Sequence, residues 1–471
     1  MSLRPVFIVV TTALIVHLAG TWILPLIDRD ETFYAEVSRE MNQRGDYLVP
    51  HFNNEAWLEK PPLLYWCQSV SFRVFGDNEF GARFPGVVAS VLSALVVFGF
   101  CSRFHEQGVA VRAAILFTLC AEMVIFGTAG VTDMLATLFV TIAAWAGWEL
   151  LDRTRVRTDK SRRFWWWTFY LALALTFLAK GPLLILPLGG LFVFWKWARV
   201  PDFFRIMKFG RGLALVAALC ACWLVPVLVK TKGELFSVLI LREVLRRFVV
   251  ADHGHGASSL LHYLLMLPFY FLLVFPAFFP WSLWLPKTLS RFRRQRSETD
   301  IYLVSCVLFT FLLFTLPNTK LIHYTLPAFP ILACLVAPVI PELDFRRWAV
   351  IMAAFNVGVS FLLFPLAARY SATFQLAQAL PLPKETEFAS TPGQEPGMIW
   401  NFRKHVQGFK TEIKENQIAG YLNKPGPRLC VLRSEAAARI TPEPGWKVVA
   451  VRGFNVVKGR RNNLTMFVKE R

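Results

Sequence analysis

The sequence is poor in charged residues, which make up 18% of its 471 positions. Soluble domains carry about 25%, and here apolar side chains fill the difference, among them 43 Phe and 16 Trp. The runs from Val6 to Ile27 and from Tyr263 to Leu285 exceed the ~18 apolar residues that suggest a membrane span. This composition excludes disordered, fibrous and cytosolic proteins.

Cysteine pairs in polar loops are also absent. The eight cysteines lie in or beside apolar segments, except Cys430 near the end of the sequence. A disulfide framework or a zinc ribbon needs paired spacings in polar loops. A removable signal is not indicated either, because the apolar stretch after Arg4 has no small-residue cleavage pattern. We interpret that stretch as the first membrane helix.

Acidic residues are outnumbered, with 32 Asp and Glu against 51 Lys and Arg, for a net charge of +19. In a soluble protein this excess would suggest nucleic acid as a partner. In a membrane protein it indicates basic cytoplasmic loops, so we expect no nucleic-acid partner.

Apolar segments recur along most of the chain and predict an all-α polytopic membrane protein. We expect about eleven transmembrane helices, with a range of eleven to thirteen. The segments are 5–27, 80–102, 108–127, 131–151, 164–179, 183–198, 211–230, 260–286, 301–316, 321–340 and 348–368.

The basic residues set the predicted orientation of these helices. With a cytoplasmic N-terminus, every alternate loop is basic, as the positive-inside rule requires. The opposite, outer face then holds the loops 28–79 and 231–259 and everything after residue 369. We therefore predict a transmembrane catalytic domain over 1–369 and an extracytoplasmic domain over 370–471.

The C-terminal domain differs in composition from the rest, with few long apolar runs. Alternating patterns in Arg428–Leu432, Lys447–Phe454 and Leu464–Val468 predict short strands, and Ser434–Ile440 predicts a helical turn or two. Together these elements indicate a small α/β domain.

The first outer loop opens with the acidic cluster Asp28, Asp30 and Glu31. A carboxylate there can act as a general base, activate an acceptor or bind a metal. The alternative is a solvated helix end, with Asp30 as the N-cap. The helix that follows, 31–43, has an apolar stripe through Phe33, which is typical of a helix lying in the membrane interface.

A second candidate in this loop is Glu59-Lys60-Pro61-Pro62. The prolines hold the preceding backbone extended, and so fix where an adjacent acid and base point. Lys60 could bind a phosphate as a point charge, while Glu59 could take a metal or pair with Lys60. The alternative is an interfacial lysine beside a helix start.

The ordered blocks Asp30–Met41, Glu59–Trp66 and Glu79–Pro85 resemble the ArnT-like family of GT-C membrane glycosyltransferases, which are related to protein O-mannosyltransferases. The resemblance is specific over residues 28–90. Sparser matches follow at Thr132-Asp133, Lys180-Gly181-Pro182, Arg247-Phe248, Pro280-Trp281-Ser282 and Lys320 through Pro327.

This resemblance implies a GT-C fold and sugar transfer from a polyprenyl-phosphate carrier to an acceptor outside the membrane. It also implies roles for single residues. Asp30 and Asp133 would be the catalytic carboxylates. Lys60, Arg247 and Tyr324 would hold the carrier phosphate. Glu59 and His255, with His253 as a rival, would bind a divalent metal, zinc or magnesium. One departure is Phe33, where family members often have Arg.

The predicted topology supports an anionic substrate independently of the resemblance. Lys60, Arg246, Arg247 and Lys320 all fall on the outer face, against the bias that sends basic residues inward. A phosphate leaving group needs cations or a metal, so we also expect Lys320 in the phosphate site. The alternative for Arg246 and Arg247 is binding of lipid headgroups.

Composition and topology predict a membrane protein with its candidate site on the outer face. The resemblance implies, further, an inner-membrane enzyme with a periplasmic active site that moves a sugar of the 4-amino-4-deoxy-L-arabinose type from undecaprenyl phosphate to lipid A, lipopolysaccharide or a related glycolipid. One alternative is transfer to protein hydroxyls. Another is a non-catalytic transporter or flippase of lipid-linked sugars, but transporters keep ionisable groups near the bilayer midplane, and here the helix centres are almost free of charge.

Overall fold

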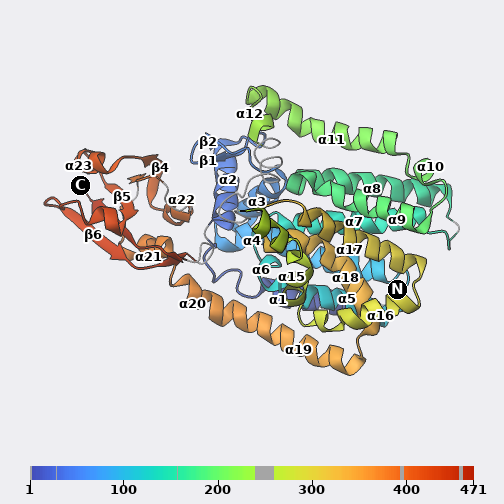
Figure 1. Ribbon diagram of the computed structural model, residues 1–471. Coiled ribbons are helices and arrows are strands. Elements are labelled where there is room, and N and C mark those ends of the chain that lie inside the picture. The colour runs from blue at the N-terminus through green and yellow to red at the C-terminus, as the bar shows by residue number, and fades with distance from the viewer. Residues whose placement is uncertain are drawn as a thin grey trace. The chain divides into compact units, whose positions relative to one another are not determined.

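The computed structural model describes residues 3–27, 29–155, 157–238, 259–383, 385–392, 397–455 and 460–470. It is mostly helical, and its longer strands all belong to the C-terminal part (Figure 1). The predicted class, a helical membrane protein with a small C-terminal α/β domain, is confirmed. The predictions on Arg246, Arg247, His253 and His255 lie outside the described residues.

The helices of the first two thirds of the chain come in the following order. They are α1 (Leu3–Leu18), α2 (Asp30–Arg44), α3 (Leu63–Phe75), α4 (Glu79–Cys101), α5 (Gln107–Leu119), α6 (Met123–Phe126), α7 (Asp133–Leu151), α8 (Asp159–Lys180), η1 (Gly181–Leu184), α9 (Ile185–Ala198), α10 (Phe203–Met207), α11 (Phe209–Lys230), α12 (Glu234–Phe236), α14 (Leu260–Met266), α15 (Phe269–Ala277), η3 (Trp281–Trp284), α16 (Leu285–Arg294) and α17 (Glu298–Thr315).

The remaining helices and the strands complete the element order. The helices are η4 (Ile322–Ala328), α18 (Phe329–Val336), η5 (Ala337–Val339), α19 (Glu342–Gly358), η6 (Val359–Leu363), α20 (Phe364–Ala368), α21 (Ala372–Ala379), α22 (Gly397–Phe402), η7 (Glu415–Gln417), α23 (Ile418–Leu422) and α24 (Ser434–Ala437). The strands are β1 (His51–Phe52), β2 (Glu55–Ala56), β3 (Thr386–Ser390), β4 (Val406–Glu412), β5 (Arg428–Arg433), β6 (Trp446–Val451), β7 (Phe454–Asn455), β8 (Arg460–Arg461) and β9 (Leu464–Lys469).

Seven helical stretches within the described residues are long and apolar enough to cross a membrane, or eight if the bent pair α14 and α15 forms one span. Helices α1 and α5 are apolar but shorter. The stretch Asp159–Ala198 counts once, although the sequence predicts two spans there. Gly181, at the start of η1, has a φ of 63°, which lies outside the range of a right-handed helix. It lies between the predicted segments 164–179 and 183–198. The protein is therefore multi-pass, and the number of eleven stays a prediction.

The chain forms two compact units whose boundary differs from the predicted one at residue 369. The larger unit contains 1–19, 58–67 and 83–357. The smaller unit contains 20–57, 68–82 and 358–471, so the first outer loop belongs largely with the C-terminal part.

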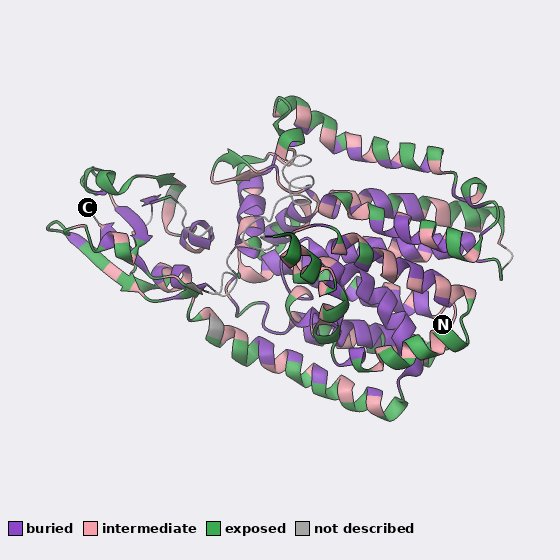
Figure 2. Ribbon diagram, viewed as in Figure 1, coloured by how far each residue is buried: buried purple, intermediate pink, exposed green. Residues whose placement is uncertain are grey.

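Helix α7 is the best buried span of the larger unit (Figure 2). Its charged residues are Asp133 at its first position and Glu149 near its last, about 24 Å apart along the axis, close to the thickness of a bilayer core. Glu149 accepts hydrogen bonds from Arg103 and Arg157. The helix thus carries one compensated charge site at each end and an apolar centre.

Outer helices of the same unit expose apolar side chains instead of polar ones. On α11, Val225 and Val229 are exposed, and on α19, Val350 and Phe355 are exposed (Figure 2). Contiguous apolar surface of this kind is costly in water, and lipid would cover it. The helices inside pack through small residues, as at Gly190 of α9, where an added Cβ would lie 2.9 Å from Cys306 Cα of α17.

In the smaller unit, α2 is the helix that the sequence predicts to lie in the membrane interface. The charged residues outside its apolar stripe, Glu36, Arg39 and Glu40, are buried. Glu36 pairs with Arg39 at 2.6 Å, and the Glu40 carboxylate accepts the backbone N–H groups of Asn53 and Asn54. Burial raises the pKa of Glu40 above its usual value. The polar side of α2 is therefore an internal polar layer, satisfied by partners of its own unit.

The C-terminal sheet has the strand order β4-β3-β5-β9-β6. Strands β3, β4 and β5 run parallel, while β9 is antiparallel to β5 and β6. The predicted strands correspond to β5, β6 and β9, and the predicted helical turn corresponds to α24. Strands β3 and β4 were not predicted from the sequence.

Candidate functional site

The larger unit contains a cavity of about 390 Å³ in which charged and apolar side chains meet. We call it the polar cavity. Its charged lining residues are Glu59, Lys60, Asp133 and Lys180. The remaining lining residues are mainly apolar, from η1, the end of α17 and η4: Pro61, Gly181, Pro182, Leu183, Ile185, Leu313, Phe314, Pro317, Thr319, His323, Tyr324 and Pro327. An apolar cavity with a few charged groups suits an amphiphile with an ionic head.

Two helix ends place the central ion pair of the polar cavity. Asp133 is the first residue of α7 and Lys180 is the last residue of α8. An anion at a helix N-terminus and a cation at a helix C-terminus are both stabilised by the helix dipole. Lys180 Nζ donates to Asp133 Oδ1 at 2.5 Å. Asp133 is 7% exposed, so its charge depends on this partner.

His323 contacts the same carboxylate from η4. Its Nε2 lies 3.8 Å from Asp133 Oδ1 and forms an ion pair when the imidazole is protonated. The ring of Tyr324, the next residue, packs on Phe314 of α17 with a centroid distance of 5.0 Å. The predicted phosphate ligand Tyr324 therefore lies in the wall of the same cavity as Asp133.

Glu59 and Lys60 reach this cavity from the loop before α3. Lys60 Nζ donates to the carbonyl oxygen of Glu59 at 3.3 Å, and Lys60 also interacts electrostatically with Asp133. Pro61 and Pro62 follow and restrict the backbone that carries the two side chains. The structure thus brings together four of the predicted site residues: Glu59, Lys60, Asp133 and Tyr324.

Lys320 is placed differently from the residues that line the polar cavity. Its ammonium group donates to the carbonyl oxygens of Phe314 and Thr315 at the C-terminal end of α17. It also lies 5.7 Å from the ring centroid of Tyr270. Burial lowers the pKa of Lys320 to about 8. In this arrangement Lys320 caps α17, and its role toward a phosphate stays a prediction.

Glu122 is a further carboxyl group in this region. It lies between α5 and α6, and neither of its side-chain oxygens has a hydrogen-bond partner among the described residues. It interacts electrostatically with Asp133 and Lys180. An ionised carboxylate without a partner is costly to bury, so we expect this group to add no negative charge to the site.

Asp30 belongs to the smaller unit. Helix α2 begins at Asp30, and the residue before it, Arg29, has a φ of 99° and takes the N-cap position. The capping alternative for Asp30 is therefore wrong. The side chain is exposed, as a group that meets a substrate must be. Phe33 stacks on Trp57 with a centroid distance of 4.5 Å.

A divalent metal was expected at Glu59 and His255. Glu59 lines the polar cavity, whereas His255 lies outside the described residues. Within the described residues, no three His, Cys, Asp or Glu side chains form a group that could hold a metal ion. The fit of a metal therefore depends on His255 or His253, and it stays a prediction.

The charges of the described lining residues cancel. Lys60 and Lys180 contribute two positive charges, and Glu59 and Asp133 contribute two negative ones, while His323 is neutral in its unprotonated form. A bound phosphate would therefore need a further positive charge, which either a protonated His323 or the predicted Arg247 could supply.

Sequence reasoning did not assign a role to Lys180 or His323. Lys180 carries a signal that could have identified it, since it follows an apolar helix on the predicted outer face, where basic residues are disfavoured. His323 carries no such signal, because its contact with Asp133 joins residues that lie 190 positions apart in the chain.

A comparison with protein families matches residues 59–229 to the family described as dolichyl-phosphate-mannose-protein mannosyltransferase. Two curated relatives are undecaprenyl phosphate-alpha-4-amino-4-deoxy-L-arabinose arabinosyl transferases. The one from Erwinia tasmaniensis is 32% identical over 65% of this chain and 54% of its own length. The one from Pectobacterium atrosepticum is 32% identical over 69% of this chain and 58% of its own length. The chain thus spans little more than half of these relatives.

Solved structures show the same fold. The crystal structure of ArnT from Cupriavidus metallidurans bound to undecaprenyl phosphate matches with a TM-score of 0.77 and 18% identity, over 99% of this chain and 98% of that one. The oligosaccharyltransferase AglB from Archaeoglobus fulgidus matches with a TM-score of 0.51 and 12% identity, over 92% of this chain and 69% of that one. The predicted GT-C fold is confirmed.

The ion pair between Asp133 and Lys180 gives a test of the polar cavity itself. We expect Asp133→Asn and Lys180→Gln each to destabilise the protein by about 3–5 kcal/mol, because each leaves a buried charge unpaired. The double variant should cost clearly less than the sum of the two. Thermal unfolding in detergent of the four proteins measures this coupling. Strictly additive losses would mean that the two side chains do not pair.

Proposed function

Since the chain belongs to the ArnT-like family of GT-C membrane glycosyltransferases, we propose that it transfers a sugar from a polyprenyl-phosphate donor to an acceptor at the outer face of the membrane. The observation that carries the proposal is the polar cavity, where Lys60 and an Asp133–Lys180 pair lie among apolar walls. A lipid-linked sugar phosphate has this combination of an ionic head and an apolar chain.

In the proposed reaction, an acceptor oxygen attacks the anomeric carbon of the donor. The bond from this carbon to the phosphate oxygen breaks, and polyprenyl phosphate leaves with the bonding electrons. Negative charge grows on the phosphate, so cations near it lower the barrier. A hydroxyl acceptor also loses its proton to a base, for which we propose Asp30. A phosphate acceptor is already ionised, and Asp30 would then orient it.

Asp133 has a different position in this scheme. Its carboxylate is bound to Lys180 and faces His323, so it is already engaged by two basic side chains. We propose that Asp133 holds Lys180 toward the phosphate and that proton transfer falls to Asp30.

We propose 4-amino-4-deoxy-L-arabinose as the sugar and lipid A or a related glycolipid as the acceptor, in a multi-pass protein of the inner membrane with a periplasmic active site. The names of the curated relatives support the sugar and the undecaprenyl-phosphate carrier. The mannosyltransferase description of the matched family favours the alternative of a protein hydroxyl as acceptor. The test therefore offers both acceptors.

The assay uses the purified full-length protein with undecaprenyl-phosphate 4-amino-4-deoxy-L-arabinose and, in separate reactions, lipid A or a protein fraction. Mass spectrometry follows the modified acceptor and the released undecaprenyl phosphate. Transfer to lipid A supports the proposal, and transfer to protein alone supports the alternative. Donor that crosses a proteoliposome membrane unchanged would indicate a flippase instead.

Substitution of Asp30 in this assay tests whether its carboxylate is catalytic or only structural. We expect Asp30→Asn to lower the transfer rate about a hundredfold or more, with normal expression and unchanged donor binding. Asp159→Asn is the matched control, because Asp159 is also an exposed first residue of a helix, α8, but lies on the predicted inner face. A wild-type rate from Asp30→Asn would mean that Asp133 is the base or that none is needed.

Lys60 and Arg247 are the cations that we propose for the donor phosphate. Because the described lining charges cancel, loss of either cation should weaken donor binding by about 1.5–3 kcal/mol, roughly ten- to a hundredfold or slightly more. Binding of undecaprenyl phosphate to Lys60→Ala and Arg247→Ala measures this loss. Lys320→Ala is the comparison, since its ammonium caps α17. Full affinity in both Lys60→Ala and Arg247→Ala would place the phosphate elsewhere.

We further propose that Glu59 and His255 bind a divalent metal, which would add a positive charge beside the phosphate. Elemental analysis of the purified protein should find zinc or magnesium, and His255→Ala should lose it. Protein that carries no metal and keeps its activity after exhaustive chelation would contradict this assignment.

A further inference from the structure

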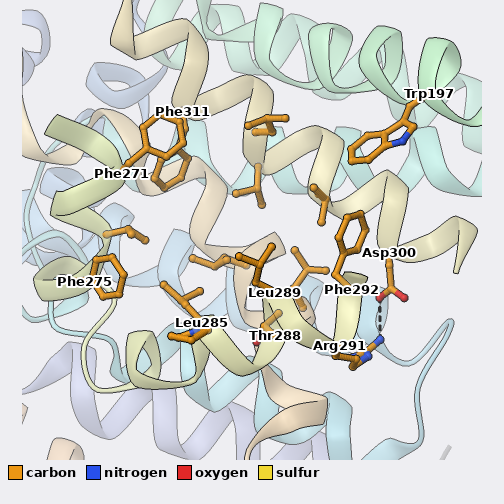
Figure 3. A pocket seen from close by; sticks show the side chains of 17 residues that line it. Trp197, Phe271, Phe275, Leu285, Thr288, Leu289, Arg291, Phe292, Asp300 and Phe311 are labelled. Carbon is orange, nitrogen blue, oxygen red and sulfur yellow. Dashed lines mark hydrogen bonds and ion pairs between the residues drawn. The ribbon is translucent and has the colours of Figure 1, made fainter. Parts of the chain in front are cut away.

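A second cavity of the larger unit, of about 580 Å³, has an almost wholly apolar lining (Figure 3). We call it the apolar groove. It lies among α9, α15, α16, α17 and α18. Phe271 and Phe275 of α15 lie toward one end of the view, and Trp197, Arg291 and Asp300 lie toward the other (Figure 3). None of these residues belongs to the polar cavity.

The groove has the depth of one membrane leaflet. Its lining residues on α17 run from Asp300 to Phe311, roughly 16 Å along the helix. This is about half the ~30 Å thickness of the hydrocarbon core. The lining of the groove is apolar enough for a hydrocarbon chain, and the groove is too short to cross the membrane.

One end of the groove carries an ion pair between Arg291 and Asp300, and α16 carries further, exposed cations. Arg291 Nη2 donates to Asp300 Oδ1 at 2.8 Å, a bond drawn in Figure 3. Helix α16 has two sides: Leu285, Leu289 and Phe292 line the groove, while Lys287, Arg293 and Arg294 are exposed. A helix with one apolar side and one basic side binds anionic membrane surfaces.

We propose that the apolar groove binds an anionic glycerophospholipid of the inner leaflet. One acyl chain fills the groove, and the phosphate group rests on the basic side of α16. Charge complementarity favours this orientation, because basic residues gather in the last turn of α16, whereas the described lining residues at the other end, Phe271, Phe275 and Phe311, are uncharged. By the positive-inside rule, the basic end faces the cytoplasm.

The polyprenyl chain of a sugar donor is the other occupant to consider. Phe314 of α17 lines the polar cavity, whereas Phe311, one turn away, lines the groove. A donor would carry its phosphate at that end of α17, near Lys60 and Lys180. The basic residues of α16 lie at the opposite end of the groove, where a donor chain offers no charge to bind them.

The experiment uses the purified full-length protein in detergent after lipid removal. Phosphatidylglycerol, phosphatidylcholine with the same acyl chains, and undecaprenyl phosphate are titrated separately, and native mass spectrometry and thermal unfolding report binding. We expect phosphatidylglycerol to bind more tightly than phosphatidylcholine and to raise the melting temperature more. The double variant Arg293→Gln/Arg294→Gln should weaken phosphatidylglycerol binding about ten- to thirtyfold and leave phosphatidylcholine binding unchanged.

A second variant tests the chain site. Val307→Phe places a larger side chain in the groove wall and should abolish the phosphatidylglycerol effect. Val350→Phe is its matched control, since Val350 on α19 is 70% exposed and should behave like the wild type. Equal binding of the two phospholipids, or full binding by Val307→Phe, would overturn the proposal. So would a result in which Val307→Phe lowers only undecaprenyl phosphate binding.

Discussion

The cost of a charge in hydrocarbon governs the arrangement of the larger unit. Each charged residue of α7 lies at a helix end and has partners of opposite charge: Glu149 with Arg103 and Arg157, and Asp133 with Lys180. A charge at the centre of a span would need a buried partner or water. Because apolar residues fill the centre of α7, the ionisable groups gather into two layers about 24 Å apart. The polar cavity is built from one of these layers. A site formed in this way suits chemistry at the membrane surface, where an amphiphilic substrate can present its head while its chain remains in lipid.

Much of this arrangement follows from the sequence. Long apolar runs predict the helices because a span must satisfy its backbone internally. Strands β5 and β9 are buried at every position but the last and contain several large apolar residues, whereas β3 contains only one, Phe388, and β4 shifts register against it. In the first outer loop, hydrophobic periodicity gives less information about structure. Its helix α2 has an amphipathic pattern, but a pattern does not reveal whether the polar side meets water or, as here, buried partners such as the Glu36–Arg39 pair.

Some residues of the candidate site could likewise be recognised from the sequence, and others could not. Glu59 and Lys60 are adjacent to two prolines, so local sequence was enough to single them out, whereas the role of Asp133 was expected from the family resemblance. His323 is recognised only through its contact with Asp133. Lys180 has an unusual position on the predicted outer face, but its pairing with Asp133 appears only in the structure. The predicted outer-face position of Lys320 makes it a candidate phosphate ligand. In the structure its ammonium group donates to carbonyl oxygens at the end of α17, and its role toward a phosphate stays a prediction. Topology gives the side of the membrane on which a cation lies, and only tertiary structure gives the direction in which its side chain points.

The charge balance of the polar cavity leads one step further. The ion pair with Lys180 stabilises the buried charge of Asp133, and it also neutralises the charge of Lys180. The negative charge of Glu59 likewise offsets the positive charge of Lys60 in the cavity lining. Electroneutral lining of this kind keeps the empty site stable in a region of low dielectric, where an uncompensated cation would be costly. It also means that these four residues cannot by themselves balance a donor phosphate. A further positive charge is needed, and the candidates are a protonated His323 and, in sequence, Arg246 and Arg247 of the loop 231–259. Under the proposed reaction, that cation governs affinity for the donor phosphate, whereas Asp30 governs the rate of transfer.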